Sequence, residues 1–85
     1  MDKDRLEQLR AVKSAHEADL MHKPHVVGVG IGLRQIEGQA TNEPAIVVSV
    51  DRKLPLSELD DDDVIPRELE GFPVDVQVIG RLWAF

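Results

Sequence analysis

The sequence contains no cysteine and no tyrosine, and its aromatic residues are one tryptophan and two phenylalanines. Without cysteine, the chain can form neither a disulfide framework nor a thiolate metal site. Basic residues are also few, ten against sixteen acidic ones, which gives a formal net charge of −6. Because nucleic-acid binders display a basic face, and often aromatic side chains on which bases stack, we expect no nucleic-acid partner. The same charge balance argues against an anionic membrane surface as a partner.

Long apolar runs are missing as well. No stretch approaches the roughly 18–20 apolar residues that a membrane-spanning helix requires. Residues 1–10 are charged throughout and lack the apolar core of a signal peptide. We therefore expect a cytoplasmic protein.

The length of the chain bounds its organisation. Its 85 residues suffice for one domain, which we place at residues 1–85. A chain of this size buries only about 60–65% of its unfolded surface, so its core is small. Oligomerisation is one way to gain buried area, and a homo-oligomer such as a homodimer is therefore one expected assembly.

Residues 2–22 are predicted to form a helix, within an N-terminal region of residues 1–24. No proline or glycine interrupts this segment before Pro24, and Asp2 or Asp4 can cap its first turn. Its apolar side chains recur at intervals of three and four residues and make one narrow stripe: Leu6, Leu9, Val12, Ala15 or His16, and Leu20. We expect this helix to lie on a sheet.

Three segments are predicted to be strands. Residues 25–33 contain apolar side chains that alternate with glycines, residues 45–50 are dense in β-branched side chains, and residues 74–79 alternate valine with polar side chains. The polar residues 34–44 suit a hairpin loop between the first two strands, which should pair antiparallel. A turn at residues 71–73 should lead into the third strand.

The region between the second and third strands is expected to cross the sheet. Pro55 and Pro66 interrupt it, so it should form short helical turns and not one long helix. The predicted fold class is α+β with the order α-β-β-α-β. We expect a three-stranded mixed sheet in the order 2-1-3 with both helices on one face, formed by residues 25–79 and followed by a tail of residues 80–85. The first strand takes the centre because it is the most uniformly apolar.

The glycines at positions 28, 30 and 32 resemble a phosphate-binding loop in composition only. Such a loop opens onto a helix N-terminus, which supplies backbone N–H groups to the anion. Here the glycines alternate within a strand pattern and no helix follows. We expect them to let the N-terminal helix or another backbone segment approach closely.

Two groups of residues were weighed as metal ligands. Residues 60–63 are four consecutive aspartates, which cannot reproduce the alternating ligands and the glycine of a calcium loop. His16, His22 and His25 are the three histidines, but few further zinc ligands accompany them. No metal site and no cofactor is predicted. A small-ligand or metal-binding domain that uses these histidines and the acidic residues remains the alternative function.

A catalytic triad is formally available in Ser49, Asp51 and a histidine, either His25 or His16. Ser49 lies inside an apolar strand, however, and no G-x-S-x-G turn surrounds it to expose its hydroxyl group. We therefore predict no catalytic residues, and no enzymatic activity of this chain on its own.

The end of the sequence carries the candidate partner-binding residues Leu82, Trp83 and Phe85. Large apolar side chains near a chain end need either burial or a partner. Two interpretations stand side by side: these residues cover the domain's own core, or they dock into a second subunit or another protein.

Six segments in order resemble the region that precedes the catalytic domain in a poorly characterised group of bacterial trypsin-like serine peptidases. They are VVGVGIG (26–32), AIVVSV (45–50), KLPLSEL (53–59), VIP (64–66), GFPVDV (71–76) and IGR (79–81). The resemblance implies a trypsin-like peptidase as a partner or as a neighbouring domain. None of that family's catalytic motifs lies within the matched segments.

The predicted function is therefore a non-catalytic accessory or protein-interaction domain. It is expected to be associated with a peptidase, in the manner of a propeptide, and to self-associate.

Overall fold

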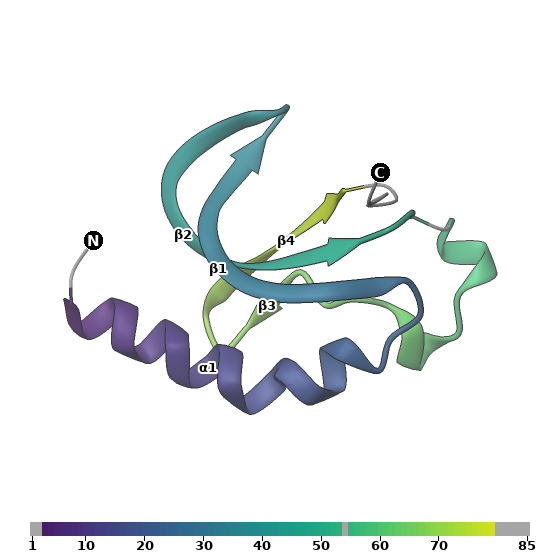
Figure 1. Cartoon of the computed structure of the whole chain (residues 1–85), viewed down its shortest axis with the longest axis horizontal. Coiled ribbons are helices and arrows are strands. Elements are labelled where there is room, and N and C mark those ends of the chain that lie inside the picture. Colours follow the sequence, from purple (N-terminus) through teal and green to yellow (C-terminus); the bar gives the residue numbers. More distant parts are fainter. Residues whose placement is uncertain (1–2, 54, 80–85) are drawn as a thin grey trace, which may run out of the picture.

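Residues 3–53 and 55–79 are described by the computed structural model, in which one α-helix is followed by four strands (Figure 1). The helix α1 spans Lys3–Met21, and the strands are β1 (Val26–Ile36), β2 (Gln39–Val50), β3 (Glu68–Leu69) and β4 (Phe72–Val78). Two short 3-10 turns, η1 (Leu56–Glu58) and η2 (Asp61–Asp63), lie between β2 and β3. The α+β class is confirmed, and so is the N-terminal helix.

The sheet has the order β1-β2-β4-β3. β1 pairs antiparallel with β2, and β2 pairs parallel with β4. The predicted order 2-1-3 is wrong, because the second strand and not the first lies between two neighbours. Pro44, Ala45 and Ile46 of β2 are buried in succession, whereas Val26 is the one buried residue of β1. Three of the apolar-looking positions of β1 are glycines, which have no side chain to bury.

The short helical turns predicted between the second and third strands are confirmed as 3-10 turns, but the second helix of the predicted order α-β-β-α-β is absent between residues 55 and 67. Instead η1 and η2 make single turns, and the β3–β4 hairpin follows. The prolines at 55 and 66 cannot donate helical hydrogen bonds, and aspartates are poor helix formers, so no longer helix can propagate here. The crossover from β2 to the parallel strand β4 consists of these turns.

Both hairpins turn on a Glu-Gly pair. Glu37 and Gly38 have φ values of 53° and 80°, and Glu70 and Gly71 have 49° and 86°. Positive φ at both central residues characterises the two-residue turn that suits the twist of paired strands. The segment predicted as the loop 34–44 is therefore mostly strand, and the turn predicted at 71–73 lies at 70–71, with Phe72 and Pro73 already in β4.

The core lies between α1 and one face of the sheet. Leu9, Leu20, Ile46 and Val48 are its largest fully buried side chains. Val29 and Ile31 of β1 stand opposite Val48 and Ile46 and pack against this cluster, as do Val74 and Val76 of β4. The guanidinium group of Arg5 lies 5.0 Å from the centre of the Phe72 ring, which links α1 to the start of β4.

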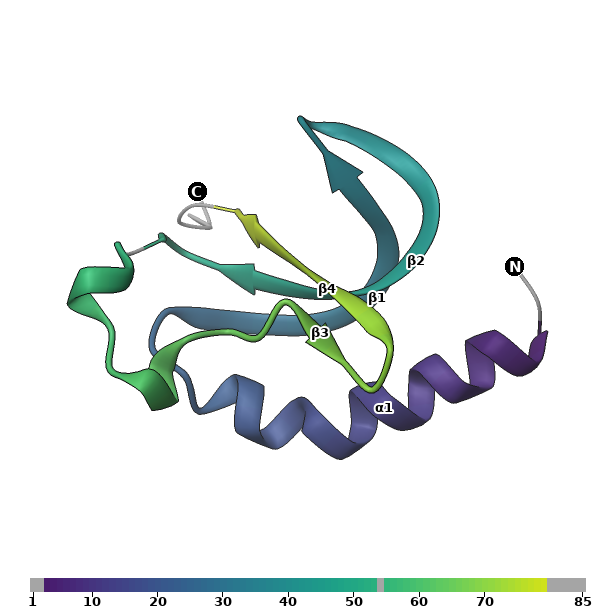
Figure 2. The same ribbon diagram turned by 180° about the vertical axis from the view of Figure 1, so that it is seen from behind.

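Within residues 3–53 and 55–79, no helix covers the other face of the sheet. In Figures 1 and 2, α1 runs along one side of the sheet, and the far end of the β1–β2 hairpin bends away from the helix toward the opposite side. Within the described ranges, no helix is long and apolar enough to cross a membrane.

Candidate functional site

A groove runs over the sheet face that α1 leaves open. Its volume is about 550 Å³, and six consecutive residues of β1, 28–33, line it together with Gln35, Ala40, Val47, Ser49 and Gln77. Because side chains alternate along a strand, the three glycines of β1 lie on the same face as Val47 and Ser49. The groove therefore follows the backbone of an edge strand.

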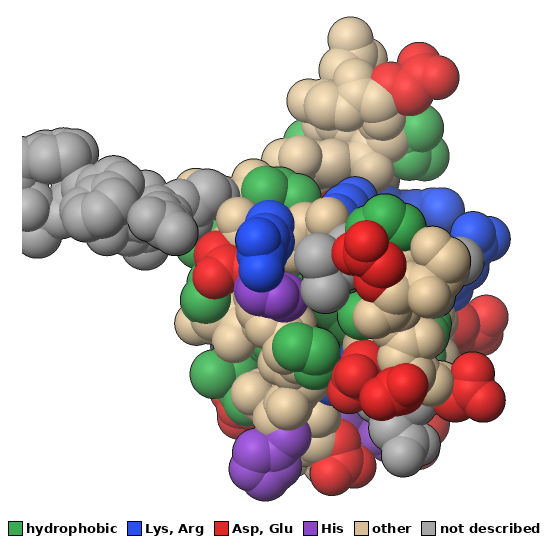
Figure 3. Space-filling model, turned by 90° about the vertical axis from the view of Figure 1, so that its right-hand side faces the viewer, with side chains coloured by type: hydrophobic (Ala, Val, Ile, Leu, Met, Phe, Trp, Pro, Cys, Tyr) green, Lys and Arg blue, Asp and Glu red, His purple; other side chains and the backbone are tan. Residues whose placement is uncertain are grey.

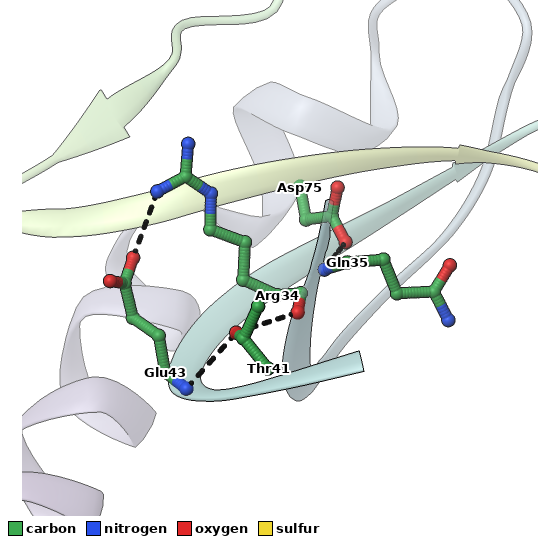
Figure 4. A network of polar contacts seen from close by, with 5 residues as sticks. All are labelled: Arg34, Gln35, Thr41, Glu43 and Asp75. Carbon is green, nitrogen blue, oxygen red and sulfur yellow. Dashed lines mark hydrogen bonds and ion pairs between the residues drawn. The ribbon is translucent and has the colours of Figure 1, made fainter. Parts of the chain in front are cut away.

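The tip of the hairpin is held over this face by Asp75. The backbone N–H of Gln35 donates to Oδ2 of Asp75 at 3.0 Å, and Nε2 of Gln77 donates to the same oxygen at 3.0 Å. In the hairpin itself, Nη1 of Arg34 lies 3.1 Å from Oε1 of Glu43 (Figure 4). The carboxylate of Asp75 thus ties the outer part of β1 to β4 across the open face.

The three glycines do not share one reason for lacking a side chain. A Cβ added at Gly32 would lie 3.1 Å from Cγ2 of Val47, which is tight, and one added at Gly28 would make an ordinary 3.8 Å contact with Ser49. A Cβ added at Gly30 would meet no heavy atom within 4 Å. The prediction that the glycines let α1 or another backbone segment approach closely is therefore wrong: the neighbours at Gly32 and Gly28 are side chains of β2, and Gly30 has no neighbour within 4 Å.

A second hollow, of about 440 Å³, lies where β2 ends, and Arg52, Lys53 and Arg67 are among its lining residues. His25, also in its lining, has a φ of 66° and connects α1 to β1. Its Nδ1 lies 2.9 Å from Oδ1 of Asp51, and Nε of Arg52 donates to its Nε2 at 3.4 Å. The imidazole thus bridges a carboxylate and a guanidinium group.

The triad residues that the sequence offers are not brought together. His25 and Asp51 do form a hydrogen-bonded pair. Ser49, however, lies in the groove on the open sheet face, and the second ring nitrogen of His25 is occupied by Arg52. A serine protease needs that nitrogen to accept the proton of the serine hydroxyl group.

The residues weighed as metal ligands are dispersed. Nε2 of His16 pairs with Oε2 of Glu70 at 3.0 Å, while His25 pairs with Asp51. Asp60 precedes η2 and makes no side-chain cap. Within residues 3–53 and 55–79, no three histidine or acidic side chains gather as a metal site would require.

Leu82, Trp83 and Phe85 lie outside the described residues. Asp75, Gln77 and Arg67 were not predicted as functional residues, because the sequence of β4 and of the segment before it contains no catalytic or ligand-binding motif. The signal that could have found the groove is the glycine alternation itself, since a strand with one side bare leaves a channel on that side.

The family model of the NARROW LEAF 1 N-terminal domain matches residues 3–83. NARROW LEAF 1 is a plant protein related to trypsin-like peptidases. No curated protein matches the chain significantly. The relationship to trypsin-like peptidases that the sequence resemblance implied is thus supported, although the matched family is named for a plant protein and the resemblance pointed to bacterial ones. The match is to an N-terminal domain, and no peptidase domain is in the chain.

Proposed function

The chain belongs to the NARROW LEAF 1 N-terminal domain family, and from this premise we propose that it is a non-catalytic accessory domain that binds an extended segment of a trypsin-like peptidase-related domain. The segment would add to the sheet along the outer edge of β1 (Val26–Ile36) and place its side chains in the glycine-lined groove. The proposal rests above all on the combination of a strand edge that pairs with no other described strand and a glycine-lined groove beside it.

The edge of β1 supplies the hydrogen bonds. β1 pairs with β2 on one side, and no other strand of residues 3–53 and 55–79 pairs with its second edge. Between Gly28 and Leu33, its outward N–H and C=O groups can therefore bond to an extended chain, as in peptide recognition by strand addition. The N–H of Gln35, further along β1, already donates to Asp75. Val27 and Leu33 on this strand are 48% and 43% exposed and offer apolar contacts at either end of the glycines.

The groove provides space for the side chains of the added segment. Six residues of an extended strand span about 20 Å, at roughly 3.3 Å per residue. Gly30 leaves the middle of this length free of side-chain atoms. An incoming side chain can enter there without any rearrangement of the sheet.

Family membership indicates which partner to expect. An N-terminal domain of a peptidase-related protein has the peptidase-type domain as its neighbour in the chain, and tethering raises the effective concentration of one for the other to about the millimolar range. A modest strand-edge interaction is then sufficient for docking.

The test is a calorimetric titration of this chain with a separately expressed peptidase-related domain of a NARROW LEAF 1-type protein. Gly30→Leu fills the groove, and we expect it to weaken binding at least about tenfold, which corresponds to about 1.4 kcal/mol. Ala18→Leu adds the same side chain to an exposed position of α1 and should leave the affinity unchanged.

Two results would contradict the proposal. In the first, Gly30→Leu binds as tightly as the unmodified chain. In the second, light scattering shows that the unmodified chain is a dimer and that Gly30→Leu is a monomer. This result would mean that a second copy of the chain binds the outer edge of β1.

A further inference from the structure

We propose that the hollow at the end of β2 is a binding site for hydrophobic carboxylates, such as the C-terminal residue of a peptide, and that it is separate from the glycine-lined groove. The hollow has a volume of about 440 Å³. Ligand pockets in proteins commonly begin at about 300 Å³, so this one suits a group the size of one or two amino-acid residues.

The floor of the hollow is apolar. Val50 is 3% exposed and belongs to the core, and Val64, Ile65 and Val76 are half-buried beside it. These side chains come from β2, from the segment before β3 and from β4. An aliphatic or aromatic group that enters the hollow is therefore removed from water on several sides, which is favourable.

The rim is cationic although the protein is acidic. Arg52, Lys53 and Arg67 line the hollow, and the carboxylates there are Asp63, in the lining, and Asp51, which is bonded to His25. No ion pair joins Lys53 or Arg67 to any residue that the structure describes. In Figure 3, which views the side of Figure 1 where β2 ends, basic and histidine side chains meet apolar atoms, and acidic side chains crowd another part of this face.

The His25–Asp51 pair acts on the ligand through Arg52. When Nδ1 of His25 donates to Asp51, Nε2 is an acceptor, and Nε–H of Arg52 donates to it at 3.4 Å. The Nη groups of Arg52 are not used by this bond. A guanidinium group held by its Nε can present those donors to a carboxylate as a pair, which is the geometry that arginine prefers. His25 and Asp51 are thus positioning residues.

The ligand class follows from the two halves of the site. An apolar floor beside a cationic rim fits a carboxylate attached to an apolar group, and both the end of a peptide and a free fatty or aromatic acid have this chemistry. A small inorganic anion would leave the floor empty, and a neutral apolar group would leave the rim unpaired. The site does not depend on the proposed binding of a strand to β1.

The experiment is an NMR titration of the chain with N-acetyl-leucine, as a mimic of a peptide end, and with hexanoate, as a free acid. For a ligand of about twelve non-hydrogen atoms we expect saturable shifts of the amide signals around the hollow, with a Kd of about 1 mM. N-acetyl-leucinamide, which lacks the charge, should bind at least about tenfold more weakly. Tighter binding of N-acetyl-leucine than of hexanoate would assign the site to peptide ends, and the reverse would assign it to free acids.

Single substitutions distinguish a direct role of the cationic rim in binding from a general effect of net charge. Arg67→Gln and Lys53→Gln should each weaken binding of the preferred carboxylate about three- to tenfold. Lys3→Gln removes the same charge from the exposed start of α1 and should change nothing. The proposal is overturned by equal binding of the amide, by an equal loss in Lys3→Gln, or by no saturable shift of the signals around the hollow at concentrations of about ten times the expected Kd. None of these results bears on the titration with the peptidase-related domain, so each proposal can fail alone.

Discussion

At the scale of single residues, Gly30 and Gly38 are both open to a side chain but differ in whether the backbone requires glycine. Both positions are open, since an added Cβ would meet no heavy atom within 4 Å at either one. They differ in backbone conformation. Gly38 has a φ of 80° in the hairpin turn, whereas Gly30 lies in β1 outside the left-handed region. Gly38 is needed by the turn, while neither backbone nor packing requires glycine at position 30.

The substitution of each glycine by alanine therefore has opposite expected effects. Gly38→Ala should lower the free energy of unfolding by about 1 kcal/mol, because an L side chain at this φ clashes with its own backbone. Gly30→Ala should raise it by about 0.5–1 kcal/mol, because alanine has less conformational freedom in the unfolded chain. Urea unfolding of the two variants beside the parent chain measures both. A loss of stability in Gly30→Ala as large as that in Gly38→Ala would contradict this account of the groove.

Sequence reasoning predicted only some of the features of single residues. It found the glycine alternation and placed it in a strand. The pairing of His25 with Asp51 could not be predicted, because 26 positions separate the two residues. They meet only because the start of β1 lies beside the end of β2. Arg67 lines the same hollow as Arg52 because the crossover between β2 and β4 passes beside the end of β2.

At the scale of elements, β2 lies between β1 and β4 and contributes several of the buried core residues. Ile46 is 0% exposed and stands between Ile31 of β1 and Val74 of β4. Ile36, near the tip of the same hairpin, is 52% exposed. The two isoleucines thus experience very different packing although both lie in strands of one hairpin.

The same conservative substitution at both positions tests this difference. Ile46→Val should lower the free energy of unfolding by about 0.5–1.5 kcal/mol, because it removes a buried methyl group from the centre of the sheet. Ile36→Val should change it by less than about 0.5 kcal/mol, as exposed substitutions usually do. Thermal or urea unfolding provides the measurement. Equal effects would mean that the hairpin tip is as well packed as the sheet centre, contrary to the fold described.

The elements themselves were largely predictable, and their arrangement was not. The helix and three of the four strands follow from apolar periodicity, which reports local burial. The predicted strand order is wrong because a run of apolar residues and glycines does not identify the central strand: glycines have no side chain to bury. The extension of β1 and β2 beyond Leu33 and before Pro44 was missed because the exposed hairpin tip carries polar side chains on both faces and shows no alternation.

At the scale of the whole molecule, one helix protects one face of a curled sheet and leaves the other open. The open groove and the cationic hollow lie on different parts of the surface, with Ser49 and Gln77 lining the first and Arg52 and Arg67 the second. The sequence resemblance anticipated the link to trypsin-like peptidases, because short segments keep their order and spacing. It could not locate the groove, since that surface forms only when β1, β2 and β4 come together.

Hydrogen–deuterium exchange of this chain, with and without the peptidase-related domain of a NARROW LEAF 1-type protein, tests the central claim most directly. Binding along the strand edge should slow exchange of the backbone amides of β1, since they would gain hydrogen-bond acceptors in the added segment, and leave the exposed face of α1 unchanged. Slowed exchange confined to α1, or bound complexes in which the amides of β1 exchange as in the free chain, would contradict the account.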